Sequence, residues 1–148
     1  MTTMSIEMLT PERVTELWPV LEPHFDAACK GNEIAKDELD AKDIYVLAIT
    51  GLVAVFVYFE DAKPTCVLGV QFNTTNGRKG ADIIALGGRN LMQFKAAYWH
   101  TILEWLKVNG VQFVDAYTNN RLSKILLDRF GFNKSCSYVR MTLQESER

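Results

Sequence analysis

The chain has 148 residues, which is enough for one domain with a substantial hydrophobic core and little else. Hydrophobic residues make up 48% of the sequence and charged residues 23%, proportions that are typical of a folded globular protein and exclude a disordered chain. The formal net charge of −2 argues against a protein that binds nucleic acid through its overall charge. We therefore expect a single domain over residues 1–148 with no nucleic-acid partner.

Cysteine content and apolar patterning bear on compartment, metal and membrane. The three cysteines, Cys29, Cys66 and Cys136, are odd in number and widely spaced, which favours free thiols over a disulfide framework or a zinc site. The N-terminus lacks the charged and apolar pattern of a signal peptide. The most apolar stretch, residues 44–59, is rich in β-branched and aromatic residues, which suits strands better than a membrane span. We expect a soluble, cytoplasmic protein without a membrane partner or a metal.

The first quarter of the chain predicts a strand and a helix. Residues 5–9 alternate polar and apolar side chains, as a half-buried strand does. Residues 10–12, Thr-Pro-Glu, combine a capping residue, a proline suited to the first helical position and an acid in the first turn. Pro19 and Pro23 then predict a bend or break in this helix. Residues 30–43 are charged and end the helical region, and a short helix can form around residues 36–40.

The middle of the chain reads as strands. Residues 44–50 and 52–59 are two β-rich runs around one glycine, and they form either a tight hairpin or one long bulged strand. A turn over residues 61–64 leads to a strand at residues 66–74. The Asn-Gly pair at residues 76–77 is a strong hairpin signal, and residues 81–86 form the returning strand.

The C-terminal half predicts a strand–helix–strand unit. Apolar residues at three-to-four spacing over residues 91–108 indicate a long helix, ended by an Asn-Gly pair. Residues 111–117 form the next strand, a short helix follows from Asn119 or Asn120, and residues 137–143 alternate as a last strand. A helix of this length between two strands implies a right-handed crossover between parallel strands. We expect a mixed α/β domain with an antiparallel N-terminal sheet and a parallel C-terminal addition.

The glycine pair Gly87-Gly88 lies between a predicted strand and the long helix. Backbone N–H groups and the positive end of a helix can meet an anion at such a turn, and Arg89 would add charge. The alternative readings are that the glycines only form a turn and that Arg89 is a surface cation. Asn120 can serve as a helix cap.

One pattern resembles a known family. The spacing Asn-x-x-Ser-x-x-x-Leu-x-x-x-Gly-Phe over residues 120–132, placed after a strand, is similar to the C-terminal signature of the GNAT (GCN5-related N-acetyltransferase) fold. The preceding strand, turn, long helix and strand match the acetyl-CoA-binding half of that fold. Leu-Gly-Gly at residues 86–88 ahead of the helix looks like the short GNAT-like proteins found in tailed bacteriophages. The resemblance implies a mixed, mainly antiparallel sheet flanked by helices and an acetyl-CoA-dependent N-acetyltransferase acting on a protein or small-molecule amine.

The resemblance also implies a site for acetyl-CoA. In the family, the pyrophosphate lies on N–H groups at the start of the long helix, and an asparagine lies near the pantetheine arm. The residues implied here are Leu86, Gly87, Gly88, Arg89, Asn90, Leu91, Met92 and Asn120. This chain lacks the usual Gln/Arg-x-x-Gly-x-Gly/Ala spacing at the turn, and Leu127 occupies the position where the family often has a tyrosine that protonates the departing thiolate.

Amine acetylation needs a base for the amine and an acid for the thiolate. The candidate bases are Glu60, Asp82 and Asp115, each of which can instead be a plain solvated carboxylate. Tyr138 and Tyr117 are the residues that could supply the proton that Leu127 cannot.

Two other classes of function remain open from the sequence. The first is a catalytically inactive GNAT-fold protein with a binding or structural role, in a phage particle or against a host protein. The second is an unrelated small α/β binding domain. The partners expected are an amine-bearing substrate or a protein partner, and aromatic residues of the long helix and the last strand suggest a homodimer. A phage origin would place the protein in the host cytoplasm or the virion.

Overall fold

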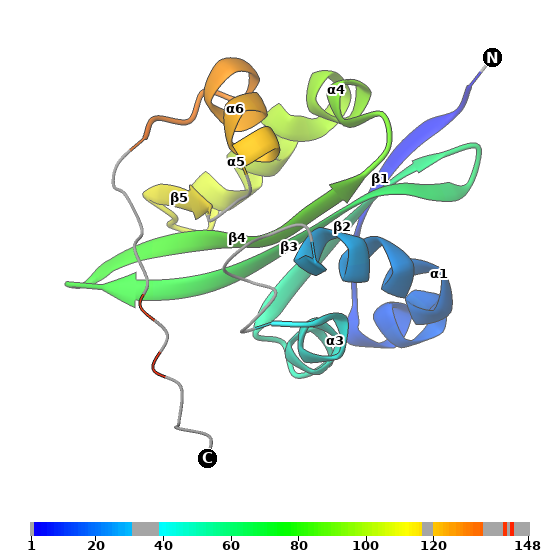
Figure 1. Ribbon diagram of the computed structural model, residues 1–148, viewed down its shortest axis with the longest axis horizontal. Coiled ribbons are helices and arrows are strands. Elements are labelled where there is room, and N and C mark those ends of the chain that lie inside the picture. Colours follow the sequence, from blue (N-terminus) through cyan, green and yellow to red (C-terminus); the bar gives the residue numbers. More distant parts are fainter. Residues whose placement is uncertain (1, 31–38, 117–119, 135–140, 142, 144–148) are drawn as a thin grey trace.

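Five strands form one sheet in the order of the chain, β1-β2-β3-β4-β5. The structure is a computed structural model, and it describes residues 2–30, 39–116, 120–134, 141 and 143. Helices α1 and α3 cover one face of the sheet, and the helices that follow β4 cover the other (Figure 1). The first four strands pair antiparallel and β5 pairs parallel with β4. This confirms the expected mixed, mainly antiparallel sheet flanked by helices.

The bounds of the five strands lie within three residues of the predicted ones, whereas the strand predicted at residues 44–50 is not formed. The strands are β1 Met4–Leu9, β2 Val53–Glu60, β3 Lys63–Thr75, β4 Arg78–Gly88 and β5 Phe113–Ala116. The strand predicted at residues 111–117 therefore begins two residues later, because the Val111 N–H bonds the carbonyl of Leu106 and still belongs to the turn after the helix. The strand predicted at residues 137–143, apart from residues 141 and 143, and most of the helix predicted at residues 36–40 lie outside the described residues.

The long helix predicted after the glycine pair is present over its full length. It consists of α4 Leu91–Phe94, the π-helix η1 Lys95–Trp99 and α5 His100–Val108, which follow one another without a break. The other helices are α1 Pro11–Lys30, α3 Ala41–Ile49 and α6 Asn120–Arg129. None of the described helices combines the length and apolar character needed to cross a membrane.

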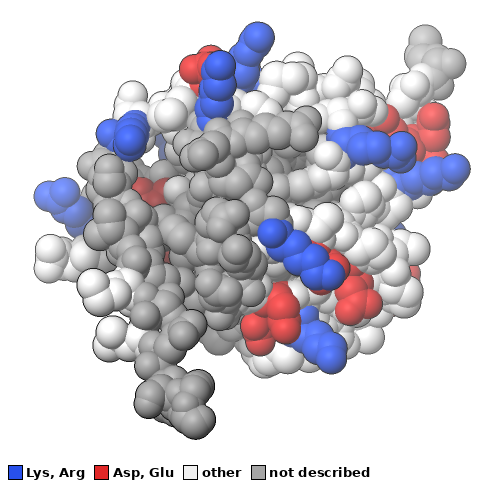
Figure 2. All heavy atoms as spheres, in the orientation of Figure 1, with Lys and Arg blue, Asp and Glu red and all other residues white. Residues whose placement is uncertain are grey.

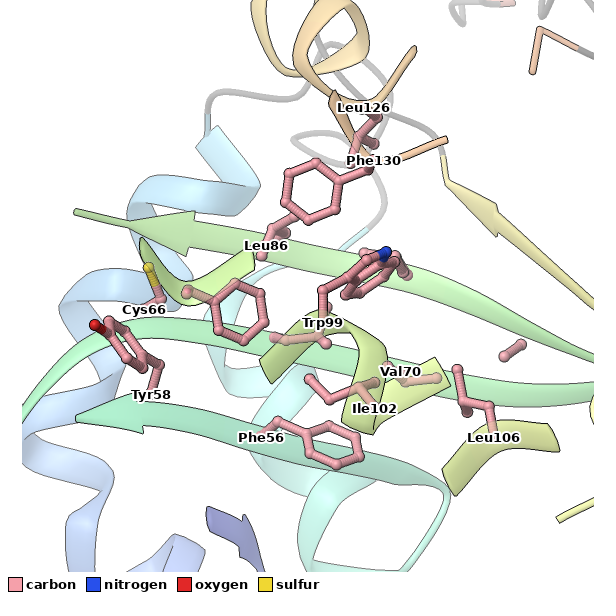
Figure 3. Close-up of a cluster of buried hydrophobic side chains, with 14 of the residues drawn as sticks. Phe56, Tyr58, Cys66, Val70, Leu86, Trp99, Ile102, Leu106, Leu126 and Phe130 are labelled. Atoms are coloured by element: carbon pink, nitrogen blue, oxygen red, sulfur yellow. The ribbon is translucent and has the colours of Figure 1, made fainter. Parts of the chain in front are cut away.

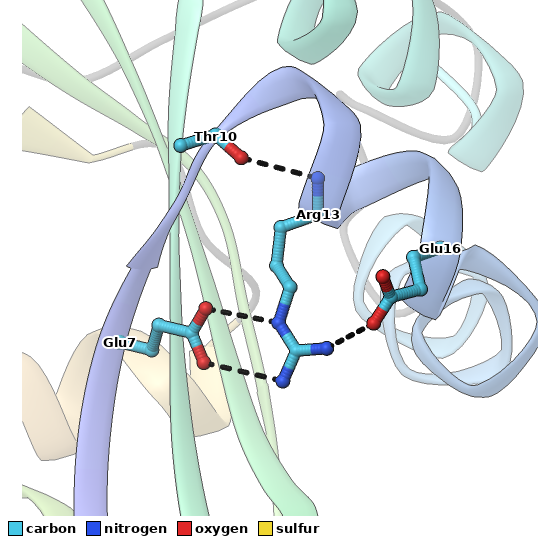
Figure 4. A network of polar contacts seen from close by, with 4 residues as sticks. All are labelled: Glu7, Thr10, Arg13 and Glu16. Carbon is cyan, nitrogen blue, oxygen red and sulfur yellow. Dashed lines mark hydrogen bonds and ion pairs between the residues drawn. The ribbon is translucent and has the colours of Figure 1, made fainter.

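Helix α1 begins as predicted but does not break at its prolines. Thr10 caps it, because its Oγ1 accepts the N–H of Arg13 at 3.2 Å. Arg13 also bonds Glu7 of β1 at 3.0 Å and contacts Glu16, which joins the strand to the helix (Figure 4). Pro19 and Pro23 lie on the exposed side of one continuous helix, so the expected break is wrong. The opposite side is held against the sheet by four buried residues, Val14, Leu21, Phe25 and Cys29.

Helix α3 replaces the strand predicted at residues 44–50, so that prediction is wrong. Its start is set by a capping box, in which Asp40 Oδ1 accepts the Asp43 N–H at 2.9 Å and Asp43 Oδ2 accepts the Asp40 N–H at 3.0 Å. Ala41, Ile44 and Ala48 recur at helical spacing and are buried together. The cap and this buried face outweigh the β propensity of the segment. Only the second of the two predicted runs becomes a strand, β2 Val53–Glu60, so neither the hairpin nor the long bulged strand forms.

The two hairpins are set by residues with positive φ. Asn76 (φ 54°) and Gly77 (φ 75°) form the predicted two-residue turn between Thr75 and Arg78. The turn between β2 and β3 contains only Asp61 (φ 51°) and Ala62 (φ 66°), so it is shorter than the predicted turn over residues 61–64.

A bulge in β4 changes the relation between β4 and β5. The register with β3 shifts after the pair Gly69–Ala85, which leaves Ile84 as an extra residue on β4. The parallel pairing with β5 joins Gly80–Ile83 to Phe113–Ala116. Beyond Ile83, β4 continues to Gly88 with no partner on that side among the described residues. The two strands part at the bulge.

Both faces of the sheet are buried, which explains the unbroken apolar run in β2. On the side of α1 and α3, the core includes Val53, Val55, Val57 and Phe59 from β2. On the side of α5 and α6, it includes Phe56, Tyr58, Leu86, Trp99 and Phe130 (Figure 3). We call these the α1 face and the α6 face.

Candidate functional site

Two predicted bases meet where β4 and β5 part. Asp82 and Asp115 are register partners on the two strands, one position before the last pair, Ile83 and Ala116. Ala81, Ile83, Val114 and Ala116 all pack on the α6 face, so both aspartates lie on the α1 face. Partial burial raises the pKa of Asp82, the charge of Asp115 raises it further, and the hydrogen bond from Asn73 Nδ2 at 2.9 Å offsets part of the rise. The sheet thus presents a carboxylate pair beside the opening.

The third predicted base, Glu60, lies elsewhere. Its carboxylate accepts the Tyr58 hydroxyl at 2.6 Å and the Asn90 Nδ2 at 2.8 Å, so it joins the end of β2 to the turn after β4. Asp82 precedes Gly88 by six residues on β4, which is about 20 Å at the rise of an extended strand. Burial, followed by the bond to Glu60, raises the pKa of Tyr58, which therefore remains a donor to Glu60. The structure does not bring Glu60 together with Asp115.

The predicted glycine pair is required by close packing within the protein. A Cβ at Gly88 (φ 121°) would lie 2.1 Å from the Thr65 carbonyl oxygen, and one at Gly87 would lie 3.2 Å from the Ala28 Cβ. The Arg89 N–H donates to the same Thr65 carbonyl at 2.9 Å, and the Cys66 thiol donates to the Arg89 carbonyl at 2.7 Å. The Arg89 N–H is therefore not free for a ligand. These contacts fix the turn on β3 and direct the chain into α4.

A groove begins at the next residues. Asn90 adopts the left-handed conformation (φ 58°) and precedes the helix, whose first N–H groups have no partner within the helix. The groove has a volume of about 440 Å³ and lies between this helix start and α6; it is lined by Asn90, Leu91, Met92, Gln93, Ile125 and Arg129. Unpaired N–H groups, the positive end of a helix and a guanidinium together suit an anion.

Sequence reasoning found one wall of this groove and missed the other. Asn90, Leu91 and Met92 were predicted as ligand contacts, whereas Gln93, Ile125 and Arg129 were not. Ile125 and Arg129 lie four residues apart and therefore on one stripe of α6, a signal that was available in the sequence.

Other predicted residues take different places. Leu86 is buried in the core of the α6 face, so only its backbone can meet a ligand. Asn120 is the first residue of α6, Leu127 is 37% exposed on the same helix, and Tyr138 and Tyr117 lie outside the described residues.

Neither described cysteine has the character of a nucleophile. Cys29 and Cys66 are free and buried, as expected of thiols without a disulfide role. Burial raises the pKa of Cys66 to about 12 with a further contribution from Glu60, and burial raises that of Cys29 to about 11. Among the described residues, no group of His, Cys, Asp and Glu is placed to hold a metal ion.

One face of the molecule carries charges of both signs. On the face drawn in Figure 2, basic and acidic side chains are interspersed over the described residues. The expectation of no nucleic-acid partner stays a prediction.

The chain is similar to known proteins in its fold. No protein-family model matches the sequence, and no curated protein matches it. Solved structures do match over nearly the whole chain. An aminoglycoside acetyltransferase from an uncultured soil metagenomic sample superposes with a TM-score of 0.69 at 12% identity, covering 96% of this chain and 99% of its own. The fold is that of the GNAT acetyltransferases.

Two further structures agree with that assignment. A GCN5-related N-acetyltransferase from Ralstonia eutropha JMP134 matches with a TM-score of 0.68 at 13% identity, covering 95% of this chain and 99% of its own. A predicted acetyltransferase from Clostridium acetobutylicum, solved with acetyl-CoA, matches with a TM-score of 0.64 at 8% identity over 95% and 96%. At these identities the likeness concerns the fold, and the narrower likeness to phage proteins stays a prediction.

Proposed function

We propose that this GNAT-fold protein is an acetyl-CoA-dependent N-acetyltransferase that acts on a primary amine. The observation that carries the proposal is the parting of β4 and β5 at the Ile84 bulge. A groove suited to an anion lies beyond the end of the open β4 edge, toward α6, and a carboxylate pair lies on the α1 face where the strands part. A GNAT fold alone does not imply activity, so the proposal depends on these residues.

The residues of the groove fit the phosphates of acetyl-CoA. The N–H groups of Leu91, Met92 and Gln93 and the guanidinium of Arg129 would hold them. The open edge of β4 after Ile83 offers backbone groups to the amide-bearing pantetheine arm, as a further strand would use them. Acetyl-CoA supplies an activated thioester, whose carbonyl carbon accepts the amine nitrogen.

Asp82 and Asp115 would act on the acceptor. Two neighbouring carboxylates attract a cationic amine and hold it at the parting of the strands. The raised pKa of Asp82 is closer to the pKa of the acceptor's ammonium group, from which Asp82 must take a proton. This favours Asp82 as the general base that frees the nitrogen lone pair. The thiolate that leaves must gain a proton, and Tyr138 stays the predicted donor because Leu127 has none to give.

The carboxylates of Asp82 and Asp115 also indicate a class of acceptor. An acidic opening suits a small polycation or the amino group of a basic peptide. Among the structures that match this fold is an aminoglycoside acetyltransferase solved in complex with sisomicin, a TM-score of 0.67 at 14% identity. We therefore propose aminoglycosides, polyamines and lysine-containing peptides as the first acceptor panel.

Calorimetric titration with coenzyme A tests the groove. We expect wild type to bind, its melting temperature to rise with ligand, and Arg129→Gln to weaken binding about tenfold at low salt. Arg78→Gln is the matched control, because Arg78 lines a different hollow near the β3–β4 turn. Absence of any melting shift at about 1 mM ligand would refute the proposed function.

A second candidate is a coenzyme-A-binding protein without turnover. Leu127 favours it, because that residue takes the place of the expected acid on α6. Release of free thiol in the presence of acetyl-CoA and the acceptor panel distinguishes the two. Turnover supports the enzyme, and tight binding with no thiol release on any acceptor supports the binding protein.

A further inference from the structure

One buried polar atom in the described part of the chain has no partner. The indole Nε1 of Trp99 forms no hydrogen bond, although Trp99 is only 5% exposed. Buried N–H groups are almost always paired, because leaving one unpaired costs free energy. A phenylalanine would occupy the same apolar surroundings without that cost. The unpaired N–H therefore needs an explanation.

The ring cannot turn its nitrogen to solvent. Trp99 is the last residue of η1 and is held edge-on against Phe130 at a centroid distance of 5.0 Å, with Phe132 at 6.2 Å. Leu86 of β4 and Leu126 of α6 belong to the same buried cluster. π-helical turns are rare and occur often at functional sites. Here the π-helical segment ends at Trp99, the residue whose indole N–H is unpaired.

The position of the nitrogen suggests what it is for. Figure 3 shows the indole nitrogen on the side of the ring away from Leu86, toward the end of β5 in that view. Val114 and Ala116 of β5 pack on the same cluster, so the cluster borders the place where β4 and β5 part. The donor is thus on the α6 face of the parting, opposite to Asp82 and Asp115.

We infer that the Trp99 indole N–H has no protein partner because it donates a hydrogen bond to a carbonyl oxygen of the bound pantetheine arm. This inference rests on the proposed function, since an amide carbonyl at the parting is what acetyl-CoA would provide. A donor fixed before binding gains a hydrogen bond without losing one to water or protein. Trp99 is a positioning residue for the arm and takes no part in proton transfer.

The chain allows a sharp spectroscopic test, because it has three tryptophans, Trp18, Trp99 and Trp105. The single variants Trp18→Phe and Trp105→Phe assign the indole N–H signals of 15N-labelled wild type by elimination, without altering Trp99. On titration with coenzyme A, we expect the Trp99 signal to move downfield as its proton becomes hydrogen-bonded. The other two signals should move less.

Affinity supplies the second readout. Trp99→Phe should keep the melting temperature of the free protein near that of wild type, because no hydrogen bond is lost, and should bind coenzyme A about tenfold more weakly. Trp105→Phe is the matched control, because Trp105 lies on the same helical segment but packs on Phe56 and Phe72. It should bind as wild type does.

Each result has one meaning. Binding by wild type with an unmoved Trp99 signal overturns this inference and leaves the proposed function standing. Equal affinity of a folded Trp99→Phe variant does the same. If that variant does not fold, the wild-type titration alone decides. Absence of binding by wild type overturns the proposed function and, with it, this inference.

Discussion

Gly88 offers the sharpest test of how the turn after β4 is built. Replacing it with alanine would place a Cβ 2.1 Å from the Thr65 carbonyl oxygen, at a φ of 121°. Backbone strain at such a φ costs about 1–2 kcal/mol. Moving the carbonyl away also weakens the Arg89–Thr65 hydrogen bond of 2.9 Å, worth about 1 kcal/mol. We expect a loss of about 3 kcal/mol in the free energy of unfolding.

Gly110→Ala is the matched control. Gly110 also has a positive φ, 85°, but nothing lies within 4 Å of the Cβ it would gain. Backbone strain alone should lower the free energy of unfolding of Gly110→Ala by about 1 kcal/mol. In thermal unfolding of a domain this size, Gly88→Ala should melt about 5–10 °C below Gly110→Ala. Equal melting temperatures would show that the packing of Gly88 on Thr65 does not hold the turn.

Three further predictions concern other residues. Asp82→Asn should lower turnover about 100-fold or more while coenzyme A still binds. Because the pKa of Asp82 is raised in the folded protein, the contribution of Asp82 to stability falls as pH rises above about 4 through its folded-state pKa. The stability of Asp82→Asn relative to wild type should therefore be greater at pH 7 than at pH 4, and the opposite order in urea titrations would contradict the reasoning. Asp40→Ala should lower the free energy of unfolding by about 1 kcal/mol through loss of the α3 capping box, measured by the same titrations. Cys66, with its pKa near 12, should react with a thiol reagent at pH 8 far more slowly in the native protein than in guanidinium, and fast native labelling would argue against its burial.

Local signals in the sequence determined several elements of the fold. The cap at Thr10, the Asn76-Gly77 turn and the helix from Leu91 to Val108 each depend on interactions within a few residues, and each is present. The residue spacing over residues 120–132, together with the order of strands and helices in the C-terminal half, indicated the GNAT fold. The sequence also predicted a ligand site near the turn after β4, and a groove begins there.

The remaining features depend on contacts between distant segments. Residues 44–49 have β propensity, but the Asp40 cap and the surface that buries Ile44 make them helical. The register of β4 against β5 pairs Asp82 with Asp115. Glu60, at the end of β2, instead bonds Asn90 beyond the far end of β4.

Tertiary contacts also changed the meaning of the glycine turn. Gly87 and Gly88 were predicted to let a phosphate approach the backbone, whereas the atoms that approach them belong to Ala28 and Thr65. The unpaired N–H of Trp99 is likewise invisible in the sequence, because a missing hydrogen bond depends on everything that surrounds the ring. Residues close in sequence can specify caps, turns and helices. Which strand edges part, and which donors they leave unpaired, is decided only when the segments pack together.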